Sequence, residues 1–317
     1  MQNGVYFWMK KRVFIHGAAG TTGLRIHDRL QARDDLTLVI LPEEKRKDPE
    51  AVADALNGSD IAFFCLPDDA AREAAAMVRN PDTVVLDAST AHRTDPDWVY
   101  GFPELSPENR RLISGSRRIA VPGCHASGFI ALAAPLVQEG ILPKTLKLTC
   151  FSLTGYTGGG KKMIAEYESE GRSPLLDAPR MYGLGQRHKH LPEMKKEAGL
   201  EETPVFCPIV ADFPAGMEVV IPLDRDQLLG GEEDIRKIYA ARYTGPVVRY
   251  REKADEEEFL SAAALAGRDS MEISVHGNGR EILLTARFDN LGKGASGAAV
   301  QCMNLALGLP EETGLNL

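Results

Sequence analysis

Short apolar runs alternate with amphipathic stretches over the first third of the chain. The apolar runs are the length of buried strands, and the stretches between them repeat their apolar residues at helical spacing. This alternation is typical of β-α-β units around a parallel sheet. It predicts strands at 13–16, 36–41, 61–66, 83–87 and 119–121, and helices at 20–33, 49–56, 68–79 and 124–139. The segment 88–116 is rich in turn residues, and we expect a long loop there.

From residue 145 the pattern changes to strands enriched in β-branched residues, with helical stretches between them. This pattern favours a mixed or antiparallel sheet with helices on one face. A final stretch of small and apolar residues, 295–307, predicts a helix that packs back on the first part of the chain. The predicted strands are 146–155, 205–210, 217–222, 270–276 and 281–288, and the predicted helices are 161–170, 192–198, 232–242 and 256–265.

Composition and charge narrow the function classes. The 317 residues suggest about two domains, and the net charge of −8 argues against a nucleic-acid partner, which requires clustered Lys and Arg. The five cysteines form no CxxC pair, so we expect neither a disulfide framework nor a zinc ribbon, and a reducing cytoplasm fits best. No apolar run is long enough for a membrane span. We interpret residues 1–8 as an upstream extension without function.

A glycine-rich turn joins the first predicted strand to the first predicted helix. Gly17, Gly20 and Gly23 have the spacing GxxGxxG, with Thr21 and Thr22 between the last two. Glycines there allow a tight turn and a close approach of backbone to a diphosphate, and the helix N-terminus supplies N–H donors. We therefore predict a Rossmann-type dinucleotide site at these five residues. The alternative interpretation is a packing turn without a ligand.

The end of the second predicted strand bears on the choice of cofactor. NAD enzymes usually carry a carboxylate at this position to bind the ribose hydroxyls. Here the strand ends at Leu41 without one, and Arg46 lies in a short charged run just beyond it. This favours the 2′-phosphate of NADP, with Arg46 as its contact. The alternative is a solvated surface run.

Cys124 lies where a short strand, a Pro-Gly turn and a helix N-terminus meet. A helix N-terminus can lower a cysteine pKa, and the thiolate is the nucleophilic form. We therefore predict thioester chemistry at Cys124, with Ser127 and the first helical N–H groups near the developing oxyanion. The other four cysteines lie in apolar patterns and fit the alternative of a buried thiol.

Thioester chemistry also requires a proton carrier. His188 and His190 precede a predicted helix that has Pro192 in its first turn, and we expect them to be accessible there. The spacing H-x-H-x-x-E, completed by Glu193, also fits metal ligands, but no further ligand cluster is evident and we predict no metal. Arg93 follows the fourth strand at its carboxyl end, where α/β sheets bind ligands, and it could clamp a phosphate or carboxylate.

These segments resemble the N-acetyl-gamma-glutamyl-phosphate reductases, in their shorter, type 2 subfamily. The matching stretches occur in order over nearly the whole chain. They are HGAAGTTG at 16–23, FFCLPDDAA at 63–71, DASTAHR at 87–93, VYGFPEL at 99–105, VPGCHASG at 121–128, RHKHLPEM at 187–194 and DNLGKGASG at 289–297. The loop residue His16 and the sequence after Cys124 depart from the pattern of the longer subfamily.

The resemblance implies NADPH-dependent reduction of N-acetyl-L-glutamyl 5-phosphate to the 5-semialdehyde, with release of phosphate, as a step of arginine biosynthesis. It implies a thioester on Cys124, with His190 or His188 as general acid/base and Arg93 on the substrate charge. Asn290 and Gly292 would lie near the nicotinamide.

The resemblance also implies an α/β fold with an NADP-binding Rossmann domain of residues 1–123 and 295–317. Residues 124–294 would form an α+β catalytic and dimerisation domain, as in semialdehyde dehydrogenases. An exposed apolar sheet face in that domain would favour a homo-oligomer, either a dimer or a tetramer.

Other functions remain open at this point. Aspartate-semialdehyde dehydrogenases share the acyl-phosphate chemistry, but their nucleophile follows Asn, whereas Gly123 precedes Cys124 here. A related reductase of a carrier-linked acyl phosphate is a further alternative. An NADP-binding sensor would leave Cys124 unexplained, and a cysteine hydrolase would not need the glycine-rich turn.

Overall fold

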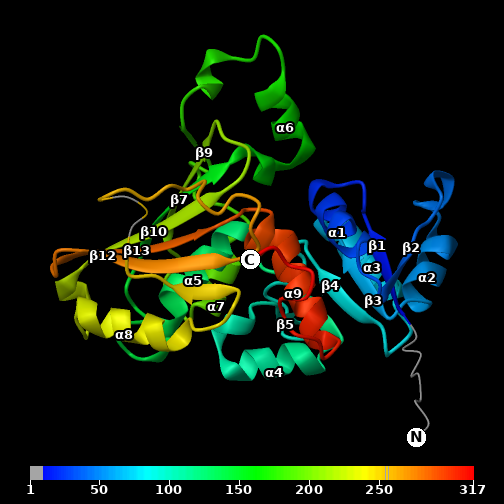
Figure 1. Cartoon of the computed structure of the whole chain (residues 1–317), viewed down its shortest axis with the longest axis horizontal. Helices are drawn as coiled ribbons and strands as arrows, with labels where there is room; N and C mark the ends of the chain where they lie inside the picture. The colour runs from blue at the N-terminus through cyan, green and yellow to red at the C-terminus, as the bar shows by residue number, and fades with distance from the viewer. Residues whose placement is uncertain (1–9, 254, 256) are drawn as a thin grey trace, which may run out of the picture.

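The computed structural model describes residues 10–253, 255 and 257–317. The first of its two sheets is parallel, with the strand order β2-β1-β3-β4-β6-β5, and lies on the right and at the centre of Figure 1. The predicted parallel sheet is therefore confirmed. Its strands are β1 (Lys11–His16), β2 (Leu36–Val39), β3 (Ile61–Phe64), β4 (Val84–Asp87), β5 (Val99–Tyr100) and β6 (Arg118–Ala120), and its helices are α1 (Thr21–Gln31), α2 (Pro49–Asn57), α3 (Asp68–Met77) and α4 (Pro107–Gly115).

The prediction of one long loop over 88–116 is wrong, because this segment contains β5 and α4. The Ser106 side chain caps α4 by accepting a hydrogen bond from the Asn109 N–H at 3.0 Å, and Pro107 occupies the first helical position. Ile113 anchors the helix and is fully buried. Ser and Pro are turn residues in general, but in this order they start a helix.

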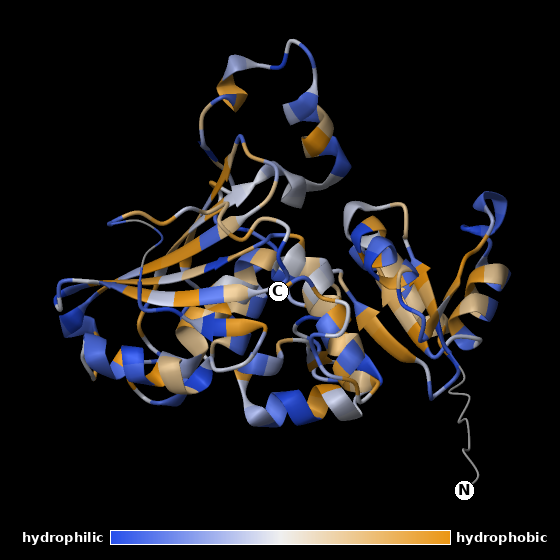
Figure 2. Ribbon diagram, viewed as in Figure 1, coloured by the Kyte–Doolittle hydropathy of each residue, from blue (hydrophilic) through white to orange (hydrophobic). Residues whose placement is uncertain are grey.

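The second sheet is mixed, with the strand order β11-β12-β13-β10-β7-β9-β8. Figure 2 shows hydrophobic residues along its strands and hydrophilic ones on the outer helix α8. The short edge strands β8 and β11 were not predicted. The strands are β7 (Thr149–Gly155), β8 (Arg180–Met181), β9 (Val205–Ala211), β10 (Met217–Asp224), β11 (Val248–Tyr250), β12 (Met271–Gly277) and β13 (Glu281–Phe288), and the helices are α5 (Cys124–Gln138), α6 (Gly160–Glu168), α7 (Leu191–Glu197) and α8 (Glu232–Arg242). The helix that follows them, α9 (Gly297–Ala306), belongs to the first sheet.

The helix predicted at 256–265 is also wrong, since the described residues from 257 to 265 form turns, an isolated bridge and irregular backbone. The side chain of Arg287 on β13 pairs with Asp255 and donates to the carbonyl oxygen of Ser261 at 3.2 Å. These contacts hold the segment against the sheet and override its local helical preference.

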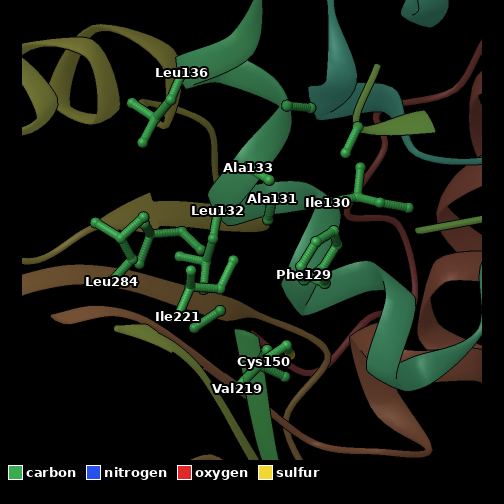
Figure 3. Close-up of a cluster of buried hydrophobic side chains, with 14 of the residues drawn as sticks. Phe129, Ile130, Ala131, Leu132, Ala133, Leu136, Cys150, Val219, Ile221 and Leu284 are labelled. Atoms are coloured by element: carbon green, nitrogen blue, oxygen red, sulfur yellow. The ribbon is translucent and has the colours of Figure 1, made fainter. Parts of the chain in front are cut away.

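Helix α5 is the centre of the larger hydrophobic core. Its residues from His125 to Val137 are all buried, so it lacks a polar face. Figure 3 shows Phe129 and Leu132 facing Val219 and Ile221 of β10, which belong to the same core cluster. This packing fixes the start of α5, and with it Cys124, relative to the second sheet.

Helix α9 packs back on the first sheet, as predicted. Val300 and Met303 belong to the same buried cluster as residues of β1, β3 and β4, and Figure 1 shows α9 (red) beside β4 and β5. The Lys293 ammonium just before α9 is fully buried and donates to Glu104 at 2.8 Å. None of the helices in the described residues is long and apolar enough to cross a bilayer.

Candidate active site

Three adjoining hollows form a trough along the carboxyl ends of the strands of the first sheet. The outer hollow, about 670 Å³, is lined by Gly17 and the end of β2. A middle one of about 240 Å³ is lined by Gly20 and Thr22, and an inner one of about 360 Å³ by Thr22 and Cys124. Neighbouring hollows share lining residues. The trough therefore connects the glycine-rich turn with Cys124.

The glycine-rich turn has the geometry of a ligand cradle. Gly17 has φ +88°, and a Cβ there would collide with the carbonyl oxygen of Cys65. A Cβ on Gly23 would lie 2.5 Å from the Gly17 oxygen, so this glycine lets α1 approach the turn. Gly20 caps α1 without a side-chain hydrogen bond. The first N–H groups of α1 are therefore free of side-chain caps beside the trough, which fits a diphosphate.

Cys124 is the first residue of α5 and lines the inner hollow. We expected the helix N-terminus to lower its pKa, but burial raises the pKa of Cys124 to about 11. The positive charge of Arg93 and the His125 N–H act in the opposite direction and offset only part of the burial effect. The thiol is therefore neutral in the free protein near pH 7, which corrects the expected resting thiolate.

Arg93 lies beside Gly123, with three of its N–H groups engaged. Its Nη1 donates to Glu193 Oε1 at 2.7 Å, its Nε to the Val121 oxygen at 2.9 Å and its Nη2 to the Ala88 oxygen at 3.0 Å. A guanidinium has five N–H groups, so two are left for a ligand. Arg93 lines the inner hollow, which places it within reach of a bound phosphate or carboxylate.

Glu193 holds the turn before Cys124. Its Oε2 accepts hydrogen bonds from Tyr100 Oη at 2.8 Å and from the Gly123 N–H at 3.2 Å. A Cβ on Gly123 would lie 2.5 Å from His190 Nε2 and 2.6 Å from Glu193 Oε1, and closer still to Arg93 Nη1. The imidazole of His190, the guanidinium of Arg93 and the carboxylate of Glu193 thus all lie against Gly123, where the absence of a side chain leaves room for them.

His190 and His188 both line the inner hollow, but the expectation that they are accessible is wrong for His190. His190 is 5% exposed, and its Nδ1 has no hydrogen-bond partner among the described residues. Burial, and secondarily the charge of Arg93, hold its pKa well below the usual range. His188 is half-buried, accepts from the His190 N–H at 3.2 Å and has a pKa lowered by burial to about 4. Both imidazoles are therefore neutral proton acceptors.

The remaining predicted residues divide into two groups. Asn290 lines the inner hollow, where its amide bridges the Gly216 N–H and Thr157 Oγ1 at 3.0 Å each. Gly292 lies below the surface of the trough in a π-turn, and its neighbour Leu291 lines the hollow instead. Ser127 is fully buried, outside the lining, and its hydroxyl donates to the Gly123 oxygen at 3.1 Å.

Arg46 lies at the outer end of the trough. It lines the outer hollow together with Lys47 and Lys161, and it forms a 3.1 Å ion pair with Glu43. Val39 ends β2 there, and Glu43 and Glu44 of the 3-10 helix that follows also line this hollow.

Sequence reasoning missed two polar groups of the inner site. Glu193 was considered only as a metal ligand, although its position three residues after His190 places both on one face of the first turn of α7. Tyr182 lines the inner hollow, and nothing in its local sequence distinguishes it. No group of three metal-ligating side chains occurs in the part of the chain that the structure describes.

Comparison with known proteins gives concordant results. Residues 12–113 match the family model "Semialdehyde dehydrogenase, NAD binding domain", and residues 124–290 match "Semialdehyde dehydrogenase, dimerisation domain". The chain is 46% identical over 321 residues to N-acetyl-gamma-glutamyl-phosphate reductase 2 of Nostoc sp., with 96% of this chain and 99% of the relative covered. It is 45% identical to N-acetyl-gamma-glutamyl-phosphate reductase of Sinorhizobium fredii, with 94% and 99% covered.

Among solved structures, the fold is similar to aspartate semialdehyde dehydrogenase II of Vibrio cholerae. The TM-score is 0.70 at 18% sequence identity, with 94% of this chain and 99% of that chain covered. The enzyme of Francisella tularensis gives a TM-score of 0.68 at 14% identity, with 93% and 99% covered. These likenesses show the fold, a nucleotide-binding domain followed by a mixed-sheet domain.

Proposed function

The chain belongs to the semialdehyde dehydrogenase family, among its N-acetyl-gamma-glutamyl-phosphate reductases, and we propose that its reaction proceeds through a thioester on Cys124. Enzymes of this group reduce N-acetyl-L-glutamyl 5-phosphate to the 5-semialdehyde and release phosphate, in arginine biosynthesis. The observation that carries the proposal is the inner hollow. There Cys124, Arg93 and His190 line one cavity at the end of the trough that starts at Gly17.

In the first half of the proposed reaction, the neutral Cys124 thiol attacks the acyl carbon while His190 accepts its proton. The C–S bond forms, and the carbonyl electron pair moves to oxygen to give a tetrahedral oxyanion. When the carbonyl re-forms, the C–O bond to phosphate breaks and a thioester remains on Cys124. Arg93 holds the negative charge of the substrate with its two remaining N–H groups, and Lys189 adds a second cation in the lining.

When bound, NADPH would supply a hydride to the thioester carbon. The oxyanion of the thiohemiacetal on Cys124 then re-forms the carbonyl as the C–S bond breaks, and the aldehyde leaves. His190 returns the proton to the sulfur, which restores the neutral thiol. We assign the proton transfer to His190 because its Nε2 lies beside Gly123, one residue from the sulfur. His188 orients it by accepting its backbone N–H.

The cofactor is a nicotinamide dinucleotide, and we propose NADP specifically. The uncapped start of α1 and the cradle at Gly17 fit the diphosphate. The cations Arg46, Lys47 and Lys161 line the outer hollow and fit a 2′-phosphate. Asn290 would border the nicotinamide, since it lines the same hollow as Cys124.

We also propose that the protein forms a homo-oligomer, either a dimer or a tetramer. Phe151, Val205 and Leu283 of the second sheet are exposed, on a domain whose family model describes dimerisation. We propose that residues 1–123 and 295–317 form the NADP-binding domain and that residues 124–294 form the catalytic domain. The five cysteines are all free, which supports a location in the reducing cytoplasm.

The reverse reaction tests the proposal. N-acetylglutamate semialdehyde and NADP are mixed with and without phosphate, and NADPH is followed by its absorbance. We expect phosphate-dependent NADPH formation with this aldehyde and not with aspartate semialdehyde. Cys124→Ser should abolish turnover and retain NADPH binding. A Ser variant with normal turnover would exclude the thioester.

A further inference from the structure

Ser152, His125 and Tyr182 form a line of hydrogen bonds that ends at the inner hollow. His125 Nδ1 lies 2.7 Å from Ser152 Oγ, and His125 Nε2 lies 2.7 Å from Tyr182 Oη. His125 follows Cys124 in the first turn of α5, Ser152 lies on β7, and Tyr182 follows β8. The mechanism above uses none of these three side chains.

The buried end of the line determines the direction of its hydrogen bonds. Ser152 is fully buried, and among the described residues its hydroxyl has only His125 as a hydrogen-bond partner. His125 is neutral because burial lowers its pKa to about 3, so only one of its ring nitrogens carries a hydrogen. Two arrangements are therefore conceivable, with hydrogen bonds running toward Ser152 or toward Tyr182.

If the bonds ran toward Ser152, the Ser152 hydroxyl hydrogen would be buried without an acceptor. An unpaired buried donor carries its full desolvation cost. If the bonds run toward Tyr182, then Ser152 donates to Nδ1 and Nε2–H donates to the tyrosine oxygen. The only hydrogen then left over is that of Tyr182, which is half-buried and lines the hollow, where substrate or water can accept it. The second arrangement is therefore favoured.

Resting on the proposed function, we infer that Tyr182 is a further catalytic residue that donates a hydrogen bond to the acyl oxygen as the thiol adds. Tyr182 keeps its proton throughout, since the oxyanion needs a donor and not a proton transfer. Ser152 and His125 are positioning residues that leave the tyrosine hydroxyl free to donate into the hollow.

The surroundings of Tyr182 suit this role. Cys124 and Tyr182 line the same hollow of about 360 Å³, and His125 lies next to Cys124 in sequence and bonds Tyr182 directly. Burial, and secondarily the nearby Cys124 sulfur, raise the pKa of Tyr182 above its usual value. Tyr182 therefore stays a protonated donor at any pH at which the enzyme works.

The test is Tyr182→Phe, which removes the hydroxyl and retains the ring. Steady-state NADPH formation is measured in the phosphate-dependent reverse reaction over a range of aldehyde concentrations, which gives kcat and KM separately. We expect the rate to fall about 100-fold with KM nearly unchanged, as for the loss of one oxyanion donor. Tyr167→Phe is the matched control. Tyr167 lies on α6 outside the hollow, and its hydroxyl accepts a hydrogen bond from Arg180 at 3.1 Å, so the rate of this variant should stay within about twofold of wild type.

A double-mutant cycle tests the positioning residues. Ser152→Ala alone should lower the rate severalfold, because either hydrogen-bond direction then becomes possible. Added to Tyr182→Phe, Ser152→Ala should change the rate no further. A merely structural Ser152 would instead lower the rate equally in both backgrounds, and that result overturns the positioning role.

The outcomes separate the two proposals. Wild-type protein without phosphate-dependent aldehyde oxidation refutes the proposed function, and the inference falls with it. Active wild-type protein with an unaffected Tyr182→Phe variant refutes the inference alone. A Tyr182→Phe variant with raised KM and an unchanged rate also overturns it, because the hydroxyl would then bind ground state and transition state equally.

Discussion

The glycine before Cys124 allows a sharp test of the site geometry. In Gly123→Ala the new Cβ would lie 2.5 Å from His190 Nε2 and 2.6 Å from Glu193 Oε1. Ordinary van der Waals contact begins near 3.4 Å. The imidazole and the carboxylate would therefore each have to retreat by roughly 0.8–0.9 Å, toward ordinary contact distances.

Neither group can retreat at little cost. Glu193 accepts hydrogen bonds from Arg93 and Tyr100, and His190 is buried at the start of α7. Overpacking of a buried site costs about 1–3 kcal/mol, and a misplacement near 1 Å in a catalytic group costs about 100-fold in rate. We therefore expect Gly123→Ala to lower the turnover rate about 100-fold and the melting temperature by a few degrees.

The assay is phosphate-dependent NADPH formation in the reverse reaction, together with thermal unfolding. Gly115→Ala is the matched control, because a Cβ there meets nothing within 4 Å and Gly115, at the end of α4, lines none of the three hollows. This variant should retain the wild-type rate. If Gly123→Ala turned over at the wild-type rate, the convergence of His190, Arg93 and Glu193 on this residue would have no catalytic importance.

Three further predictions concern other parts of the molecule. Lys293→Met leaves the buried Glu104 carboxylate without its cation, so the free energy of unfolding in urea should fall by about 3–5 kcal/mol; an unchanged value would mean that the pair is dispensable. Alkylation of Cys124 by iodoacetamide should accelerate about tenfold per pH unit from pH 7 to 10, because burial raises the pKa of this thiol to about 11; a plateau below pH 8 would indicate a resting thiolate. Arg46→Ala should raise the Kd of NADPH about tenfold and leave that of NADH unchanged, measured by fluorescence titration; equal losses would argue against a 2′-phosphate contact.

Much of the fold follows from local patterns in the sequence. The strands of the first sheet other than β5 are short, apolar and followed by helical spacing, so their residues alone indicate a parallel sheet. Two segments do not behave this way. α4 starts from a Ser-Pro pair that also occurs in turns, and the segment after Asp255 loses its helical preference to contacts with Arg287, which is distant in sequence.

The candidate site shows the same division between local and distant determinants. Cys124 and the glycine-rich turn carry local signals, because a helix N-terminus and a strand-to-helix turn are both visible in the sequence. Ser152 on β7 and Tyr182, which follows β8, are separated in sequence and are both bonded by His125. No local pattern predicts such a contact, since it depends on the strand order.

The neutral thiol of the half-buried Cys124 restricts how the proposed reaction can begin. Its pKa is raised to about 11, while that of His190 is held well below its usual value near 6.5. Moving the proton from sulfur to imidazole before attack is therefore unfavourable, because burial disfavours both the thiolate and the imidazolium. A separate thiolate-imidazolium pair would be scarcely populated. The proton must consequently leave the sulfur as the C–S bond forms, when the negative charge passes to the acyl oxygen. A donor fixed at that oxygen then stabilises the charge at the moment it appears, which is the role inferred for Tyr182.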